Sequence, residues 1–328
     1  MSFSAQLRRF AAPMFRHGLS QRAALRLAAR RGRSIVLLYH RILPDGTAPD
    51  PIVPSLQQHL FLRHLDALLR VGDIVPLTQL LEPPRLGQRP RIALTFDDDH
   101  AGYAGTVVPE LQARGVTATF FVSGRSLHGL PPYWWTSVEH SLRSHGLERT
   151  RCLLGLNGRT VADLAVALER SPDAAQLASR LPHVDEPSMT AEDIRAMVRA
   201  GMRIGFHTLH HPVLSMLAEG PLEAALTEGR RELAAAAGAP VDLLAYPHGR
   251  ATAAVADAAE RAAFTAAFTA GGRPITTTSD RFLLDRWEPG PLGADELGAA
   301  VAMRLMRSPT APHSVRRKRL QRNETRQS

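Results

Sequence analysis

The chain has 328 residues, of which 44% are hydrophobic and 22% are charged. This composition is typical of a globular protein with a sizeable core, so a chain that is disordered throughout is excluded. The net charge of +9 would suggest a nucleic-acid-binding protein if it were spread along the chain, but it is not.

The two ends carry the positive charge. Residues 1–33 hold eight arginines and no acid, and residues 307–328 hold seven basic residues and one glutamate. Taking +8 and +6 from +9 leaves −5 for residues 34–306, so we expect no nucleic-acid partner for the main domain. We therefore predict a basic N-terminal segment (1–33), a globular domain (34–306) and a basic, disordered tail (307–328).

Arginines interrupt the apolar residues of the N-terminal segment, so it lacks the apolar run of a secretory signal. No other stretch approaches the roughly 18 to 20 apolar residues of a membrane span. Residues 4–32 have the pattern of a basic helix that would contact an anionic membrane, and an arginine-rich tail without fixed structure is the alternative. We expect a cytoplasmic or membrane-peripheral protein.

Short apolar runs alternate with helical patterns through the main domain. The runs predict buried strands over 34–39, 91–96, 117–122 and 203–206. The helical patterns cover 60–71, 106–114, 191–200, 222–237 and 253–263, and three of them stop at a glycine. This alternation predicts a parallel α/β sheet or barrel, which residues 125–187 interrupt as a helical insertion on its rim.

Three consecutive carboxylates follow the second predicted strand, in Thr95-Phe96-Asp97-Asp98-Asp99-His100. The carboxyl ends of parallel strands form the functional edge of α/β proteins. Carboxylates this close repel one another, and a cation is their natural partner. A solvated turn or a helix N-cap would use the same residues, so this motif alone does not establish a site.

Histidines gather after the fourth predicted strand. His207 and His211 are four residues apart, so on a helical turn both imidazoles would face one metal ion, while His210 offers a competing spacing of three. Two imidazoles and one carboxylate leave a coordination position for water, as in catalytic zinc sites, and a second aspartate would be free to act as a base. Cys152, the only cysteine, excludes a disulfide framework and adds no ligand.

A third segment, Ala245-Tyr246-Pro247-His248-Gly249, is a strand end that breaks into a turn. Together, the three segments resemble the motifs of the polysaccharide deacetylase family (carbohydrate esterase family four): TFDD, H-[ST]-x-x-H and a variant AYPHG form of the third motif. Further similarity at 37–42, 118–121 and 285–287 extends the resemblance over about residues 34–290.

The resemblance implies an incomplete or distorted (β/α) barrel of the polysaccharide deacetylase type, with a helical insertion. It also implies that Asp98, His207 and His211 bind a divalent metal, most simply Zn²⁺, and that Asp97 is the general base. The backbone amide of His248 would bind the oxyanion. In such a mechanism the metal lowers the pKa of water and the base removes its proton.

The sequence departs from the family pattern at several positions. Asp99 and His100 replace the glycine and the aromatic residue that follow TFDD, which would make the rim more acidic. Ala245 stands where an arginine would orient the catalytic aspartate, and Arg286 is the substitute that we expect in salt-bridge contact with Asp97. The general acid of the family, a C-terminal histidine, has no clear counterpart, so His40 and His248 are the candidates.

Substrate contacts are expected from the third motif and from the start of the insertion. The candidate residues are Tyr246, Pro247, Trp134 and Trp135, the tryptophans either stacking on sugar rings or only packing. We predict a metal-dependent hydrolase that removes an N-acetyl group from a sugar, glycan precursor or glycoconjugate. An amide hydrolase with a non-carbohydrate substrate and an inactive sugar-binding protein are the alternatives.

Overall fold

The computed structural model describes residues 18–84, 87–171, 173–182 and 187–309. Its central feature is a parallel sheet in the order β1-β5-β6-β7-β8-β9-β10, with β4 paired to the start of β5. A separate small sheet pairs β2 with β3. The strands are β1 Ser34–Tyr39, β2 Arg41–Leu43, β3 Ser55–Gln57, β4 Asp73–Ile74, β5 Arg91–Asp97, β6 Thr119–Val122, β7 Arg203–Phe206, β8 Leu243–Ala245, β9 Ala266–Thr269 and β10 Leu284–Asp285.

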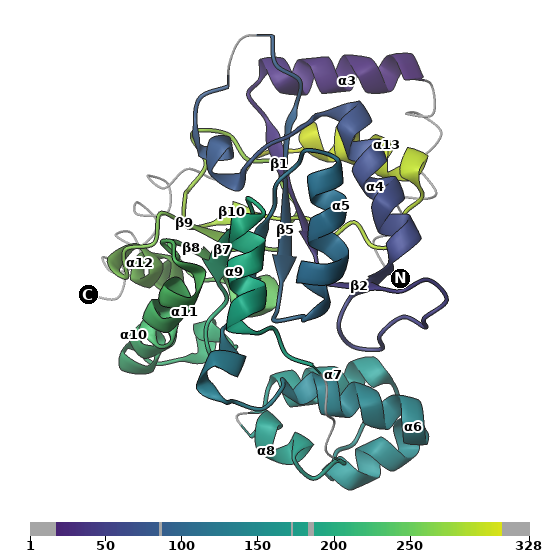
Figure 1. Cartoon of the computed structure of the whole chain (residues 1–328), viewed down its shortest axis with the longest axis vertical. Helices are drawn as coiled ribbons and strands as arrows, with labels where there is room; N and C mark the ends of the chain where they lie inside the picture. Colours follow the sequence, from purple (N-terminus) through teal and green to yellow (C-terminus); the bar gives the residue numbers. More distant parts are fainter. Residues whose placement is uncertain (1–17, 85–86, 172, 183–186, 310–328) are drawn as a thin grey trace, which may run out of the picture.

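The sheet curls into a nearly closed barrel with helices around it (Figure 1). The seam lies between β1 and the chain after β10, which meet through the backbone of Trp287: Leu38 N donates to Trp287 O and Trp287 N donates to Val36 O, both at 2.8 Å. This contact is an isolated bridge rather than a full ladder, so the barrel is incompletely sealed there. The expected incomplete (β/α) barrel is confirmed.

The helices follow the predicted alternation. Three of them, α6 to α8, form the insertion, which lies below the barrel in Figure 1 and has a small apolar core of its own. The helices are α3 Gly18–Arg30, α4 Gln58–Val71, α5 Val108–Ala113, α6 Trp134–Leu154, α7 Val161–Glu169, α8 Ala174–Ala178, α9 Ala191–Arg199, α10 Glu219–Thr227, α11 Arg230–Ala237, α12 Ala253–Arg261 and α13 Ala294–Leu305.

Alternating side chains of each strand build two cores. In β1, Ile35, Leu37 and Tyr39 face the helices, whereas Val36 belongs to a smaller cluster inside the barrel that includes Phe121. This period of two is expected for strands buried on both faces.

One predicted helix is two helices. The pattern over 222–237 predicts a continuous helix, but α10 ends at Thr227 and α11 begins at Arg230. Gly229 between them has a φ of +76°, a left-handed conformation that no helix continues through.

The N-terminal segment is not a tail separate from the domain. Helix α3 packs on α13, and it places Leu25 (9% exposed) and Ala28 (fully buried) in the main core. Residues 1–17, and the predicted disordered tail from residue 310 onward, lie outside the described residues. Among the described helices, none combines the length and the apolar character that crossing a bilayer requires.

Candidate active site

A cavity of about 330 Å³ opens at the carboxyl ends of the barrel strands, where parallel α/β folds place their sites. Its walls come from the ends of six strands (β1, β5, β7, β8, β9 and β10), from residues 52–54 and from the insertion. The polar residues that line it are His40, Asp97, Asp98, Glu169, His207, His211, His248, Arg286 and Glu288.

Three of these side chains are arranged as metal ligands. Asp98, His207 and His211 each offer a ligand atom, and these atoms lie within 4.8 Å of one another. The two Nε2 atoms of the histidines are 3.2 Å apart, and His207 Nε2 is 3.8 Å from Asp98 Oδ1. Asp98 Oδ1 is buried without a hydrogen-bond partner among the described residues, which leaves it available to a cation.

The histidines converge through a loop and not through a helical turn. The chain leaves β7 after Phe206, and Thr208 (φ +62°) and His211 (φ +52°) take left-handed conformations before the chain continues. The expectation of a helical turn is therefore wrong, although the pairing that it predicted is present. His210 lies outside the cluster, half exposed beside Glu228.

Backbone strain is concentrated at the three motifs. Five described residues other than glycine have a positive φ, and four of them are Asp98, Thr208, His211 and His248. Such conformations cost free energy and persist where the surrounding structure holds them, which is common at functional sites.

Burial keeps the imidazoles of His207 and His211 neutral. It lowers the pKa of His207 to about 4 and that of His211 well below its usual value. The hydrogen bond between His207 Nδ1 and the carbonyl of Ala245, 2.9 Å, fixes the ring so that Nε2 points to the cluster. Burial also raises the pKa of Asp98 to about 7, which the charge of Asp97 reinforces and that of His40 opposes.

Asp97 is held by the predicted arginine. Arg286 Nη1 and Nη2 donate to its two carboxylate oxygens at 2.5 and 2.7 Å, and both side chains are buried. Burial alone would raise the pKa of Asp97, but the charge and hydrogen bonds of Arg286, together with the electrostatic effect of His207 and His40, outweigh it and hold this pKa below its usual value. Asp97 is therefore ionised, as a base must be.

His40 forms a second ion pair across the cavity. Its Nδ1 lies 2.9 Å from Glu288 Oε1. Burial lowers the pKa of His40, but the hydrogen bond and charge of Glu288, with the charges of Asp97 and Asp98, overcome this and raise it to about 9. His40 is therefore protonated at neutral pH.

His248 is tied to the insertion. Its Nδ1 lies 2.7 Å from Glu169 Oε1, at the end of α7, and its ring stacks edge-on against His211 with centroids 4.6 Å apart. Burial lowers the pKa of His248. The ring thus bridges the insertion and the histidine loop.

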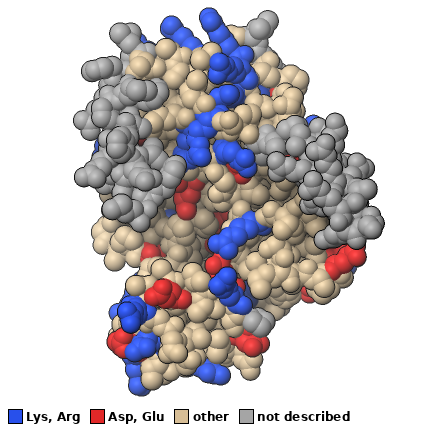
Figure 2. Space-filling view, turned by 180° about the vertical axis from the view of Figure 1, so that it is seen from behind, with Lys and Arg blue, Asp and Glu red and all other residues tan. Residues whose placement is uncertain are grey.

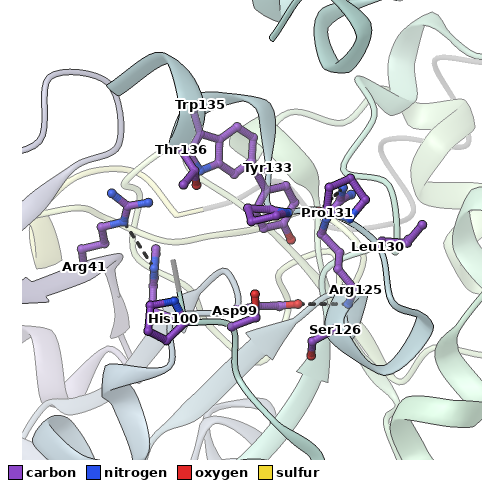
Figure 3. A pocket seen from close by; sticks show the side chains of 13 residues that line it. Arg41, Asp99, His100, Arg125, Ser126, Leu130, Pro131, Tyr133, Trp135 and Thr136 are labelled. Atoms are coloured by element: carbon purple, nitrogen blue, oxygen red, sulfur yellow. Dashed lines mark hydrogen bonds between the residues drawn. The ribbon is translucent and has the colours of Figure 1, made fainter. Parts of the chain in front are cut away.

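The extra acid, Asp99, does not enrich the cavity rim. It turns away to accept hydrogen bonds from the backbone N–H and the hydroxyl of Ser123, both at 2.6 Å. It also accepts one from the backbone N–H of Arg125 at 3.1 Å (Figure 3). His100 accepts a hydrogen bond from Arg41 Nε at 3.3 Å in the same small pocket. The expectation of a more acidic rim is therefore wrong, and Asp99 instead anchors the loop after β6.

Arg41 and a buried acid fix the insertion to the barrel. Glu139 of α6 accepts a hydrogen bond from Arg41 Nη1 at 2.7 Å and from the backbone N–H of Val53 at 2.7 Å. Glu139 is fully buried, so this contact would be costly to break. It sets the position of the two tryptophans that begin α6.

Two of the four expected substrate contacts are absent from the cavity. Tyr246 is fully buried in the core, where its hydroxyl donates to the carbonyl of Phe282 at 2.8 Å, and Pro247 is buried as well. Trp134 and Trp135 do line the cavity. Trp135 is 5% exposed between Tyr133 and His211, so it mainly packs, and Trp134 is left to meet a ligand.

Glu169 and Glu288 are site residues that the sequence analysis did not single out. Glu288 lies two residues after Arg286 on the same extended stretch, and side chains two apart face the same side, so this spacing was a usable signal. Glu169 ends an ordinary amphipathic helix, and nothing in the sequence marks it.

The strand-end cavity thus holds three candidate metal ligands beside an ionised carboxylate, an arrangement that metal-assisted hydrolases use. The family model for polysaccharide deacetylase matches residues 86–267, more than half of the chain. The chain therefore belongs to the polysaccharide deacetylase family.

Solved structures share the fold. The deacetylase PplD of Streptococcus pyogenes, in complex with acetate, matches with a TM-score of 0.58 and 16% identity, over 81% of this chain and 96% of that one. IcaB from Ammonifex degensii matches with a TM-score of 0.54 and 19% identity, over 84% and 97%. A de-N-acetylase of Aggregatibacter actinomycetemcomitans matches with a TM-score of 0.54 and 15% identity, over 79% of this chain and 95% of that one. No curated protein matches the chain.

Proposed function

We propose that this protein removes an N-acetyl group from a sugar, a glycan precursor or a glycoconjugate, with the help of a divalent metal, most simply Zn²⁺. The observation that carries the proposal is the juxtaposition of the Asp98, His207 and His211 cluster with the Arg286-bound Asp97 in one cavity. Family membership supports deacetylation of a carbohydrate.

The residues fit a divalent cation. One carboxylate and two neutral imidazoles form the three-protein-ligand set of catalytic zinc, and the buried Asp98 Oδ1 has no other described partner. When bound, such an ion polarises a carbonyl and lowers the pKa of water.

Asp97 and His40 divide the proton transfers. The ionised Asp97 takes the proton from the attacking water, whose oxygen forms the new bond to the amide carbon. His40, protonated through Glu288, gives its proton to the amine as the carbon–nitrogen bond breaks, so that acetate and the free amine leave. The His248 amide is the proposed donor to the oxyanion.

His40 is preferred over His248 as the acid because of their partners. The pKa of His40 is raised and that of His248 is lowered, so only His40 carries a proton to donate near neutral pH. His248 instead holds Glu169 and the ring of His211, and its side chain is a positioning group.

The decisive experiment measures acetate release from a panel of N-acetylated sugars, oligosaccharides and simple acetamides, with and without a chelator. Chelator-sensitive release from the sugars, abolished in Asp97→Asn, would support the proposal. Release from acetamides alone would favour a non-carbohydrate amidase, and sugar binding without release would favour an inactive binding protein. The inactive alternative rests on two departures from the family pattern, the missing arginine of the third motif and the missing general acid. The Arg286 contact with Asp97 argues against it on the first of these.

We also propose that the protein is cytoplasmic or membrane-peripheral. The arginine-rich surface of α3 supports this placement.

A further inference from the structure

The barrel carries a second large concavity at the end opposite to the active site. A groove of about 620 Å³ runs between α3, the end of α4 and the chain that enters β5. Arg89 and Pro90 line it immediately before Arg91, whereas the active site begins at Asp97, the last residue of the same strand. At about 3.3 Å per residue, roughly 20 Å of β5 separates the two.

Five arginines and no carboxylate line this groove: Arg22, Arg26, Arg30, Arg70 and Arg89. Arg22, Arg26 and Arg30 are four residues apart on α3, so they follow one helix face and point along the groove. All five are exposed. Figure 2 shows basic atoms gathered at the upper end of the molecule, where α3 lies, with the acidic atoms mainly lower.

Little within the protein offsets this charge. Among the described residues, Arg22, Arg26, Arg30 and Arg70 form no ion pair, and only Arg89 has a carboxylate nearby, Asp73 at 3.4 Å. Like charges held in one groove repel, so an external anion stabilises the arrangement.

The walls of the groove are fixed. Leu25 and Ala28 bury the inner face of α3, and Arg33 Nη1 donates to the carbonyl of Leu305 at 2.8 Å, just after α3 ends. The arginines are thus presented by a packed helix.

The exposed face of α3 also carries an apolar residue. Leu27 is 38% exposed, one of three large hydrophobic side chains that the described surface leaves open. It lies beside Arg26 and one turn from Arg30 and Arg31. Exposed arginines with an apolar side chain among them are typical of helices that lie on an anionic bilayer, whereas an RNA partner would gain nothing from Leu27.

We propose that this groove docks the protein on the phosphate headgroups of an anionic lipid surface, with Leu27 entering the acyl boundary. The proposal rests on the membrane-peripheral placement proposed above and does not depend on the deacetylase reaction. The active site lies at the other end of β5, so docking leaves the cavity open to the aqueous side.

The test uses the full chain and vesicles of phosphatidylcholine with or without about one third phosphatidylglycerol, in a sedimentation assay. We expect binding to the anionic vesicles only, weakening as salt rises. The variant Arg22→Gln/Arg26→Gln/Arg30→Gln should lose about tenfold or more in affinity, since each arginine near a charged surface contributes about 1 kcal/mol. The matched control Arg149→Gln/Arg195→Gln/Arg231→Gln makes the same charge change on α6, α9 and α11 and should lose less than about twofold.

Two further arms identify the source of the phosphate. Leu27→Gln should weaken vesicle binding about threefold or more, and added inorganic phosphate should compete no better than chloride at equal ionic strength. Equal losses of vesicle affinity in the two triple variants would show that the groove is not the docking surface. Displacement by inorganic phosphate would indicate a soluble ligand, and tight RNA binding that ignores Leu27→Gln would indicate nucleic acid; either would overturn the lipid assignment. Unchanged far-UV circular dichroism and thermal unfolding show that each variant is folded.

Discussion

Arg286 and Asp97 meet through two parallel hydrogen bonds, from Nη1 and Nη2 to Oδ1 and Oδ2, although 189 residues separate them in the chain. The guanidinium also lies over the ring of Phe121, 5.2 Å from its centroid. A fork that donates twice fixes both the charge and the rotation of the carboxylate, which a point charge cannot do. Ala245, in the third motif, leaves this task to a residue from a different strand end.

Replacing this arginine should slow turnover without emptying the metal site. Arg286→Ala frees Asp97 to rotate, so we expect kcat to fall on the order of 10² with metal content unchanged. Arg286→Lys keeps the charge but loses the two parallel N–H donors, so its kcat should lie between those of wild type and Arg286→Ala. Arg273→Ala is the matched control, because Arg273 pairs with Asp285 outside the cavity. A wild-type rate in Arg286→Ala would show that Asp97 needs no anchor.

Substitution of the two neighbouring aspartates, Asp97 and Asp98, should affect metal content and turnover differently. Asp98→Asn and His207→Ala remove ligands, so both should lose the one bound ion per chain that we expect, together with activity. Asp97→Asn should keep the ion and lose turnover. Elemental analysis of the dialysed proteins measures this, with His210→Ala as the control. The reverse pattern for Asp97 and Asp98 would mean that their roles are exchanged.

His40 should make stability depend on alkaline pH. Its folded pKa, about 9, is above the unfolded value of about 6.5, so the ion pair with Glu288 stabilises fully below pH 6.5 and is lost as the pH rises through 9. Urea unfolding of the metal-free protein should show wild type losing free energy of unfolding over this window relative to His40→Gln. Glu288→Gln should also reduce the dependence of the free energy of unfolding on pH over this window. The control His59→Gln, on the exposed surface, should leave this dependence unchanged. Parallel curves for wild type and His40→Gln would remove the basis for His40 as the acid.

Helix α3 should contribute to stability, because it places Leu25 and Ala28 in the main core. Leu25→Ala removes a buried side chain and should lower the free energy of unfolding by roughly 2 to 3 kcal/mol. Leu27→Ala, on the exposed face of the same helix, should change it by less than about 0.5 kcal/mol. Equal effects in chemical denaturation would place α3 outside the core.

The strands and the first ligands were predictable because their signals are local. A buried run ending in Asp97-Asp98 must deliver its carboxylates to the strand end, whatever surrounds it. Arg286 was also within reach, since an apolar run precedes it. The break at Gly229 was not, because a glycine inside an alanine-rich pattern is tolerated in many helices and only the tertiary structure selects its left-handed conformation.

The partners of the histidines depend on contacts that no local pattern records. Glu169 reaches His248 only after the insertion has folded against the barrel. Glu169 was missed, whereas Tyr246 was wrongly expected to contact substrate because it lies in a motif. Its hydroxyl instead donates to the carbonyl of Phe282 inside the core. Motif membership fixes a backbone position and leaves the direction of the side chain open.

The cavity is built from two parts of the chain that have different roles, the barrel strand ends and the insertion. Bond cleavage is assigned to strand-end residues of the barrel, whereas Trp134 and Glu169 come from α6 and α7, which pack around an apolar core of their own. The outer part of this wall can change in shape while the ligand geometry is kept, provided that the contacts of Trp135 with His211 and of Glu139 with Arg41 remain. Exchange of residues 125–187 with a foreign segment that keeps these two contacts and a carboxylate for His248 is therefore a route to altering which acetylated compound enters while preserving the bond that is cut.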